Sequence, residues 1–234
     1  MSNLNEIFNQ FTKTLSKFLS APKNIIDIFT NPISLITILG CLIIFIVLFK
    51  AKKIKFDAKI ITRIGIALAL ATILQAFKIY RFPQGGSVTL GSMVPILLIG
   101  FMYGPSIGML TGFLFGMINM IMDPYILHPV QVLFDYPLPY LCLGVTGFFR
   151  NNRMIGSAIA ILLRFLCHFI SGVIFFGSFA PKGISPFIYS LIVNGSIMGA
   201  DGLICLIIIY LLPIKRLINT INNNQKSKRK LLHN

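Results

Sequence analysis

The chain has 234 residues, of which 56% are hydrophobic and only 12% are charged. So few charged side chains cannot cover the surface of a soluble domain of this length, so the composition indicates a membrane protein. The net charge of +15 does not indicate nucleic-acid binding. The basic residues cluster between and beyond apolar runs, as in cytoplasmic membrane loops, and no nucleic-acid-reading motif is visible.

The first thirty residues are predicted to form an interfacial segment. Apolar residues recur at helical spacing over residues 4–19, with Asn, Gln, Lys and Ser on the opposite face. This pattern is typical of an amphipathic helix that lies on the membrane, and a helix that docks on a partner is the alternative. We expect no cleavable signal peptide here, because a compact apolar core followed by a small-residue cleavage site is missing.

Seven apolar runs follow. A bilayer core about 30 Å thick requires roughly 20 apolar residues in helical form. The runs cover residues 33–49, 60–79, 88–102, 107–122, 130–149, 155–176 and 187–212. We therefore predict an all-α, polytopic membrane helix bundle, in which the third run is short and interrupted by glycine.

Lysine and arginine predict the orientation of these spans. They gather in three segments, residues 50–63, 150–153 and 215–230. Seven spans put all three on one side, which is then the cytoplasmic side and holds the C-terminus. The opposite loops, residues 81–87, 123–129 and 177–186, are rich in Gly and Pro and are predicted to form an external mouth.

Four ionisable residues fall inside the predicted spans: Asp135, Arg164, His168 and Asp201. Such residues are costly in a membrane and usually functional. Arg164 and His168 are four residues apart and share a helix face, on which Gly172 lies one turn further out. A deep arginine needs an acidic partner, so we predict an ion pair of Arg164 with Asp201, which could serve only to hold helices together.

The remaining acid has the surroundings of a cation site. Asp135 is followed by Tyr136, and Tyr140 lies nearby, so a carboxylate and aromatic faces are available to an organic cation. On the last span, Tyr189 and Asn194 lie towards the external end. The amide of Asn194 can donate and accept, as a heteroaromatic ring requires, or it can join two helices.

No pattern predicts catalysis, a cofactor or a metal. A phosphate-binding GxxxxGK[ST] loop, an HExxH motif and a nucleophile with an orienting base and acid are all missing from the sequence. If ATP drives transport, another chain must hydrolyse it. An intramembrane enzyme would require a nucleophile or metal constellation, whereas a purely structural scaffold would tolerate replacement of Asp135, His168 and Asn194.

Two pairs of small residues mark the second span. Gly65 with Ala69, and Ala67 with Ala71, are each four residues apart. Small residues at this spacing allow close helix approach, either within the chain or to a partner subunit.

Four motifs occur in order along the chain. They are PQGGSV (residues 83–88, followed by Pro95 and Gly104), HPVQVLFDYPLPY (128–140), LLRFLCHFISGVIFFGSFAPKG (162–183) and IYSLIVNG (188–195). At these residues the chain resembles the YuaJ/ThiT family, the thiamine-specific S components of energy-coupling factor (ECF) transporters. The resemblance covers about residues 60–212.

The resemblance implies that residues 60–213 form a six-helix substrate-binding core. Outside this core, the apolar and charge patterns predict an interfacial segment at residues 1–30, an additional transmembrane helix and a basic cytoplasmic linker at residues 31–59, and a basic cytoplasmic tail at residues 214–234. The implied partners are thiamine, an ECF coupling protein, two ATPase subunits and membrane lipid. The alternative cargo is a related vitamin or a thiamine precursor such as the pyrimidine moiety.

The resemblance also implies roles for individual residues. Substrate binding falls on Asp135, Tyr136, His168, Gly172, Tyr189 and Asn194, and on the aromatic positions Phe115, Tyr125 and Phe176. Contact with the coupling protein falls on Gly65, Ala67, Ala69 and Ala71. Asp201 has no acidic counterpart in the family. We therefore hypothesise that it neutralises Arg164 and leaves Asp135 for the ligand.

Overall fold

The computed structural model describes residues 57–81 and 86–220, together with scattered single positions between residues 9 and 46. The predicted interfacial segment (1–30), most of the segment 31–59 and the tail beyond residue 220 lie outside the described residues. Within the described ranges the chain is mostly helical, as predicted.

The elements follow one another in six segments that run alternately up and down the bundle. They are α4 (Ala58–Ala76); the strands β1 (Lys78–Arg81) and β2 (Ser87–Thr89) with α5 (Val94–Tyr103); α6 (Pro105–Met122); α7 (Pro129–Asp135), α8 (Pro137–Cys142) and the 3-10 helix η1 (Leu143–Phe148); α9 (Arg153–Phe175); and, after the 3-10 turn η2 (Gly177–Phe179), α10 (Pro186–Leu211).

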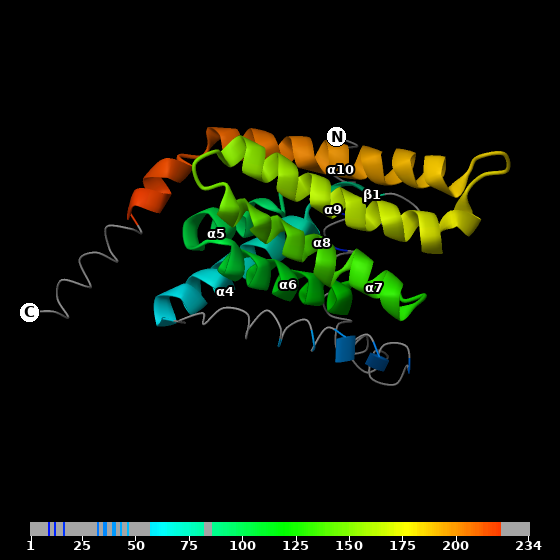
Figure 1. Ribbon diagram of the computed structural model, residues 1–234, viewed down its shortest axis with the longest axis horizontal. Coiled ribbons are helices and arrows are strands. Elements are labelled where there is room, and N and C mark those ends of the chain that lie inside the picture. The colour runs from blue at the N-terminus through cyan, green and yellow to red at the C-terminus, as the bar shows by residue number, and fades with distance from the viewer. Residues whose placement is uncertain are drawn as a thin grey trace, which may run out of the picture.

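Helices α9 and α10 run side by side along one edge of the molecule, and α4, α5, α6 and α8 lie beneath them (Figure 1). Of the described helices, α4, α6, α9 and α10 are each long and apolar enough to cross a membrane, and α5 is a shorter apolar helix. Large apolar side chains remain exposed along these helices, for example Ile66 at 62% and Ile174 at 63%. Such surfaces suit lipid rather than water, so the prediction of a polytopic helical membrane protein is confirmed.

The sequence predicts one helix over the apolar run 88–102, but the structure does not form a single helix there. Its first residues form β2, which pairs antiparallel with β1 in the register Tyr80–Val88 and Arg81–Ser87. Gly91 then turns the chain with a φ of 88°, a conformation that favours glycine. Helix α5 begins only at Val94, with a proline in its first turn, where the missing N–H costs no hydrogen bond. The hairpin lies at the end of the bundle where the mouth was predicted.

The predicted span 130–149 is also broken. Tyr136 ends α7 and precedes α8, whose first residue is Pro137. A proline at that point has no N–H to continue the α7 ladder, so the helix stops there. The break leaves Asp135 and Tyr136 between two short helices, within the bundle.

Glycines on α6 set the position of this broken segment. A Cβ atom on Gly112 would lie 2.0 Å from the carbonyl oxygen of Tyr140, and one on Gly116 would lie 2.4 Å from that of Tyr136. One turn before Gly112, a Cβ on Gly108 would lie 2.9 Å from the Cα of Gly144. The backbone of α6 is therefore in direct contact with the backbone of the broken segment at three successive glycines, as small-residue faces permit.

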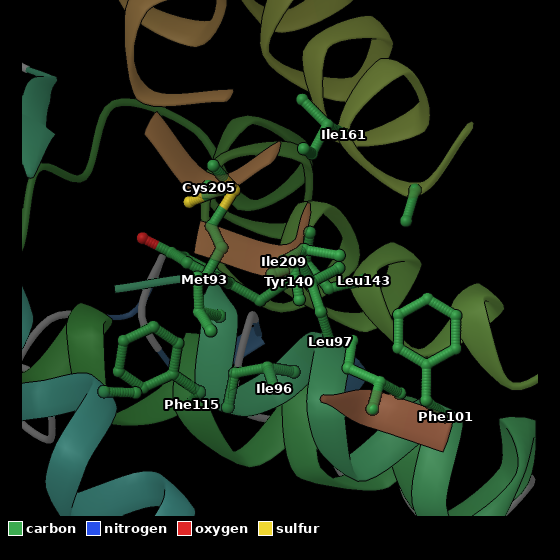
Figure 2. Close-up of a cluster of buried hydrophobic side chains, with 14 residues drawn as sticks. Met93, Ile96, Leu97, Phe101, Phe115, Tyr140, Leu143, Ile161, Cys205 and Ile209 are labelled. Atoms are coloured by element: carbon green, nitrogen blue, oxygen red, sulfur yellow. The ribbon is translucent and has the colours of Figure 1, made fainter. Parts of the chain in front are cut away.

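The core fills the space between these segments. Among its fully buried side chains are Met93, Leu97, Phe101, Phe115, Leu143 and Ile209 (Figure 2). Ala71 belongs to the same cluster, and Ala67 is 7% exposed. These two alanines pack inside the bundle, which corrects their prediction as partner-facing residues. Gly65 and Ala69 lie on the exposed side of α4.

Arginines fasten the helix ends at the other end of the bundle. Arg150 donates from Nε to the carbonyl of Phe101 (2.8 Å) and from Nη2 to that of Met102 (2.9 Å), at the end of α5. Arg153 donates to the carbonyls of Tyr210 and Leu212 at the end of α10. Cations at helix C-termini satisfy free carbonyls and oppose the helix dipole.

Candidate functional site

A cavity of about 520 Å³ opens at the hairpin end of the bundle. This volume is in the usual range for a small-molecule site. Six segments of the chain line it, and the lining includes Gln75, Lys78, Arg81, Gly86, Asp123, Tyr125, Asp135, Tyr136, Tyr140, Arg164, His168, Gly172, Phe176, Tyr189, Ser190 and Asn194. The loops that were predicted to form a mouth therefore surround it.

Asp135 is held by two neighbours. Gln131 donates from Nε2 to Oδ2 of Asp135 at 2.5 Å, and Nδ1 of His168 lies 3.5 Å from Oδ1. The Asp135 side chain is 17% exposed, so it is accessible from the cavity but largely removed from solvent. A carboxylate in this position supplies negative charge and hydrogen-bond acceptors to a ligand.

The loop after α6 is tied to the same region. Gln131 donates to the carbonyl of Tyr125 (3.1 Å) and accepts from the amide of Leu127 (3.0 Å). The hydroxyl of Tyr136 donates to the carbonyl of Asp123 (2.7 Å) and accepts from the amide of Tyr125 (2.8 Å). These bonds fix the loop because each buried polar group has a backbone partner there.

The fixed loop positions an aromatic wall. The ring of Tyr125 stacks on that of Phe176, with centroids 5.7 Å apart, and Phe176 contacts Phe179 at 6.1 Å. Both Tyr125 and Phe176 line the cavity. Their π-faces suit a flat or cationic ring system.

The opposite wall depends on Gly172. A Cβ atom there would lie 2.3 Å from Ser190 Oγ and 2.8 Å from Asn194 Nδ2, so only glycine permits this approach of α9 to α10. Ser190 donates to the carbonyl of Phe169 (2.8 Å), and Asn194 Nδ2 donates to Ser190 Oγ (3.1 Å). The amide of Asn194 is thereby oriented, and its oxygen remains available as an acceptor.

The floor of the cavity is a buried charge network. Nη1 of Arg164 lies 3.8 Å from Oδ2 of Asp201, and the Arg164 guanidinium lies 4.4 Å from the centroid of the Tyr140 ring. Asp201 is 1% exposed and accepts from the amide (2.9 Å) and hydroxyl (2.8 Å) of Thr89 in β2. This network connects α9, α10 and the hairpin.

Several buried polar atoms of the lining have no hydrogen-bond partner within the described ranges. They are Gln75 Oε1, Arg164 Nε, His168 Nε2 and Tyr189 Oη. Buried polar groups are normally paired, so a group of unpaired ones around one cavity indicates a polar ligand. Gln75 was missed by sequence reasoning, because a lone glutamine near the end of a span gives no recognisable signal.

Three charged residues at the mouth were also missed. Asp123 Oδ2 lies 3.6 Å from Lys78 Nζ and 3.2 Å from Arg81 Nη2, so the loop after α6 is joined to β1. Asp123 is 42 residues from Arg81 in the sequence, so a local pattern does not show that the loop after α6 meets β1.

The structure gathers eight of the nine predicted ligand-binding residues around the cavity. The exception is Phe115, which is fully buried in the hydrophobic core (Figure 2) and packs edge-on against Tyr140, with ring centroids 4.9 Å apart. Among the described residues, no group of three or more His, Cys, Asp or Glu side chains could hold a metal ion.

Comparisons with known proteins agree with this architecture. A family model described as "Thiamine transporter protein (Thia_YuaJ)" matches residues 61–221. The thiamine transporter ThiT of Bacillus subtilis is 38% identical over 168 residues, which cover 64% of this chain and 87% of that protein. ThiT of Lacticaseibacillus paracasei is 28% identical over 123 residues, which cover 44% and 61%. A solved structure of ThiT from Listeria monocytogenes has a TM-score of 0.61 at 23% identity, and the match covers 68% of this chain and 96% of that one.

Proposed function

Because the chain belongs to the thiamine transporter protein family (Thia_YuaJ), we propose that it captures thiamine in the cavity between α4, α7, α9 and α10. Members of this family are transporters and not enzymes, which confirms the expectation from the sequence. The observation that carries the proposal is the cavity itself. Of its two acids, Asp123 pairs with Lys78 and Arg81, and Asp135 pairs with no Lys or Arg of the described residues. The cavity combines Asp135 with an aromatic wall and several unpaired polar atoms.

The chemistry of thiamine matches these three parts. Thiamine joins a positively charged thiazolium ring to an aminopyrimidine ring and carries a hydroxyethyl group. Asp135 supplies the negative charge that a cation requires, and Tyr125 and Phe176 supply π-faces for a flat ring. His168, Tyr189 and Asn194 supply hydrogen-bonding atoms for a heteroaromatic ring and its amino group. Gly172 supplies the space.

The pair of Asp201 with Arg164 leaves Asp135 available to a ligand. Arg164 is 6% exposed, and without a counter-charge it would attract the carboxylate of Asp135. The pair with Asp201 holds Arg164 at the floor, while the polar side chains beside Asp135 in the described part of the chain are Gln131 and His168. The carboxylate of Asp135 is therefore available to the ligand.

The cavity opens to the outside of the cell in this proposal. At the opposite end of the described bundle lie Lys59, Arg63, Arg150, Arg153, Lys215 and Arg216. This excess of basic residues is typical of the cytoplasmic side. Six segments separate residue 57 from residue 220, so both lie on the same side of the membrane. The C-terminus, which follows residue 220, is therefore cytoplasmic.

The chain acts as the S component of an ECF importer, with residues 60–213 as the binding core. A coupling protein and two ATPases supply the energy, since the sequence holds no ATP-binding loop. The exposed Gly65 and Ala69 on α4 form the contact with the coupling protein.

Thiamine binding by the purified full chain in detergent tests the proposal. Calorimetry is suitable, because the chain has no tryptophan whose fluorescence could report binding. We expect binding that Asp135→Asn weakens by about 10- to 150-fold, since a hydrogen bond to a charged group contributes about 1.5–3 kcal/mol. Asp57→Asn is the matched control. It removes one acid at the far end, where Asn caps α4 as well as Asp.

The outcomes separate the candidate cargoes. A folded wild-type chain that does not bind thiamine would remove the assignment. If the aminopyrimidine moiety alone competes as strongly as thiamine, the cargo is the precursor. Uptake into proteoliposomes that requires ATP and the partner module would test the transport role.

A further inference from the structure

A basic depression lies at the end of the bundle opposite the thiamine cavity. Its lining comes from the turn before α9 and from the short helical stretch after α10, and includes Asn151, Asn152, Arg153, Pro213, Lys215 and Arg216. No acidic residue lines it. Lys215 and Arg216 are exposed and form no ion pair with any residue in the described ranges.

The depression has a fixed frame. Arg153 donates to the carbonyls of Tyr210 (3.0 Å) and Leu212, and its guanidinium lies 5.9 Å from the centroid of the Tyr210 ring. These contacts hold the start of α9 against the end of α10. The side chain of Asn152 accepts from the amide of Ile155 (3.3 Å), which holds the turn before α9. The unpaired Lys215 and Arg216 therefore lie beside Arg153, whose side chain is held in place by these contacts.

Apolar surface adjoins the charges. Ile155 is 50% exposed on the first turn of α9, and Tyr210 and Leu211 are 64% and 73% exposed on the last turn of α10. Both helices have the length and hydropathy of membrane spans. The charges thus lie at headgroup level, next to a surface that faces acyl chains.

We propose that this depression binds the phosphate headgroup of an anionic phospholipid. Lys215 and Arg216 pair with the phosphate, and the acyl chains lie along the exposed faces of α9 and α10. Basic pockets between helices on the cytoplasmic side are suited to such headgroups. Inorganic phosphate has the same charge chemistry but makes no use of the apolar surface, so the lipid is the better match.

The test is the thermal unfolding of the full chain, purified in a neutral detergent. The probes are a phosphatidylglycerol, a phosphatidylcholine with the same acyl chains, and inorganic phosphate at matched concentrations. A ligand that binds only the folded state raises the unfolding temperature. We expect phosphatidylglycerol to raise it more than phosphatidylcholine or inorganic phosphate does. We expect Lys215→Gln with Arg216→Gln to lose at least about half of that additional rise.

Two matched variants serve as controls. Lys59→Gln with Lys182→Gln removes the same charge from exposed sites outside the depression and should keep the full rise. The swap Lys215→Arg with Arg216→Lys preserves the charge and should also keep it. Equal effects of the two lipids, an equal effect of inorganic phosphate, or a full rise in the double Gln variant would each overturn the proposal. Loss of the rise in the Lys59 and Lys182 variant would do so too, because the effect would then follow net charge.

Discussion

His168 and Asp135 meet across the cavity although they belong to helices α9 and α7. Nδ1 of His168 lies 3.5 Å from Oδ1 of Asp135, and Nε2 of His168 has no hydrogen-bond partner among the described residues. One ring nitrogen is therefore beside the acid, and the other is unpaired. We propose that the histidine orients the carboxylate and that its second nitrogen contacts the ligand.

The first prediction concerns this pair. We expect Asp135→Asn and His168→Gln each to weaken thiamine binding, and the double variant to lose less than the two single losses combined. Residues in direct contact typically show a coupling of about 0.5–3 kcal/mol in a double-mutant cycle. Calorimetry on the four proteins measures it. Additive losses would mean that the two side chains act on the ligand independently.

The second prediction concerns Gly172. We expect Gly172→Ala to reduce thiamine binding and to lower the unfolding temperature, because the added Cβ would collide with Ser190 and displace Asn194. Overpacking of this kind costs about 1–3 kcal/mol. Gly195→Ala is the control on the facing helix, where the nearest atom to an added Cβ lies 4.0 Å away. Unchanged binding in Gly172→Ala would show that α9 and α10 can separate without cost.

The third prediction concerns the buried pair at the floor. We expect Asp201→Asn to destabilise the protein by about 3–5 kcal/mol, because it leaves the charge of Arg164 buried without compensation. The amide oxygen of Asn can still accept from Thr89, so loss of those bonds would not explain the effect. The unfolding temperature and thiamine affinity are the measurements.

A second variant isolates the cause. Arg164→Met combined with Asp201→Asn removes both charges and should recover much of the stability that the single change loses. If Asp201→Asn alone has wild-type stability and affinity, Asp201 does not neutralise Arg164 in the way proposed.

Sequence patterns predicted the helical membrane architecture because apolar length is a strong signal. They failed where a single hydrogen bond or turn residue interrupted an apolar run that was otherwise suited to a helix. The run 88–102 contains enough apolar residues for a helix. Thr89 nevertheless donates to Asp201 and Gly91 turns the chain, so the run starts in β2 and the helix begins only after the turn. Asp201 is 112 residues away, and a long-range partner of this kind is invisible in a local pattern.

In the candidate site, too, some residues could be predicted from the sequence and others could not. Asp135, Arg164, His168 and Asp201 were predicted because ionisable residues stand out in apolar spans. Phe115 and Ala71 are apolar residues in apolar spans, so only their packing could show that they belong to the core. Lys78 and Arg81 lie at the mouth because they belong to the β1–β2 hairpin, which the periodicity of the sequence did not predict.

The last prediction concerns the outer face of α4. Gly65 and Gly199 both lie on exposed helix faces, and an added Cβ at either would meet no heavy atom within 4 Å. Gly65→Leu and Gly199→Leu should therefore leave thiamine binding by the solitary chain unchanged. Only Gly65→Leu should impair uptake in proteoliposomes that contain the coupling protein and ATPases, because close helix approach requires a small residue at the contact.

The two glycine variants are matched in helix propensity, added volume and exposure, so the comparison isolates the partner. Impaired uptake in both would indicate a general effect on the membrane-embedded surface. Normal uptake in Gly65→Leu would exclude this face of α4 as the contact. Weaker thiamine binding in Gly65→Leu alone would instead mean that α4 transmits strain to Gln75 and Lys78, which lie near its cavity end.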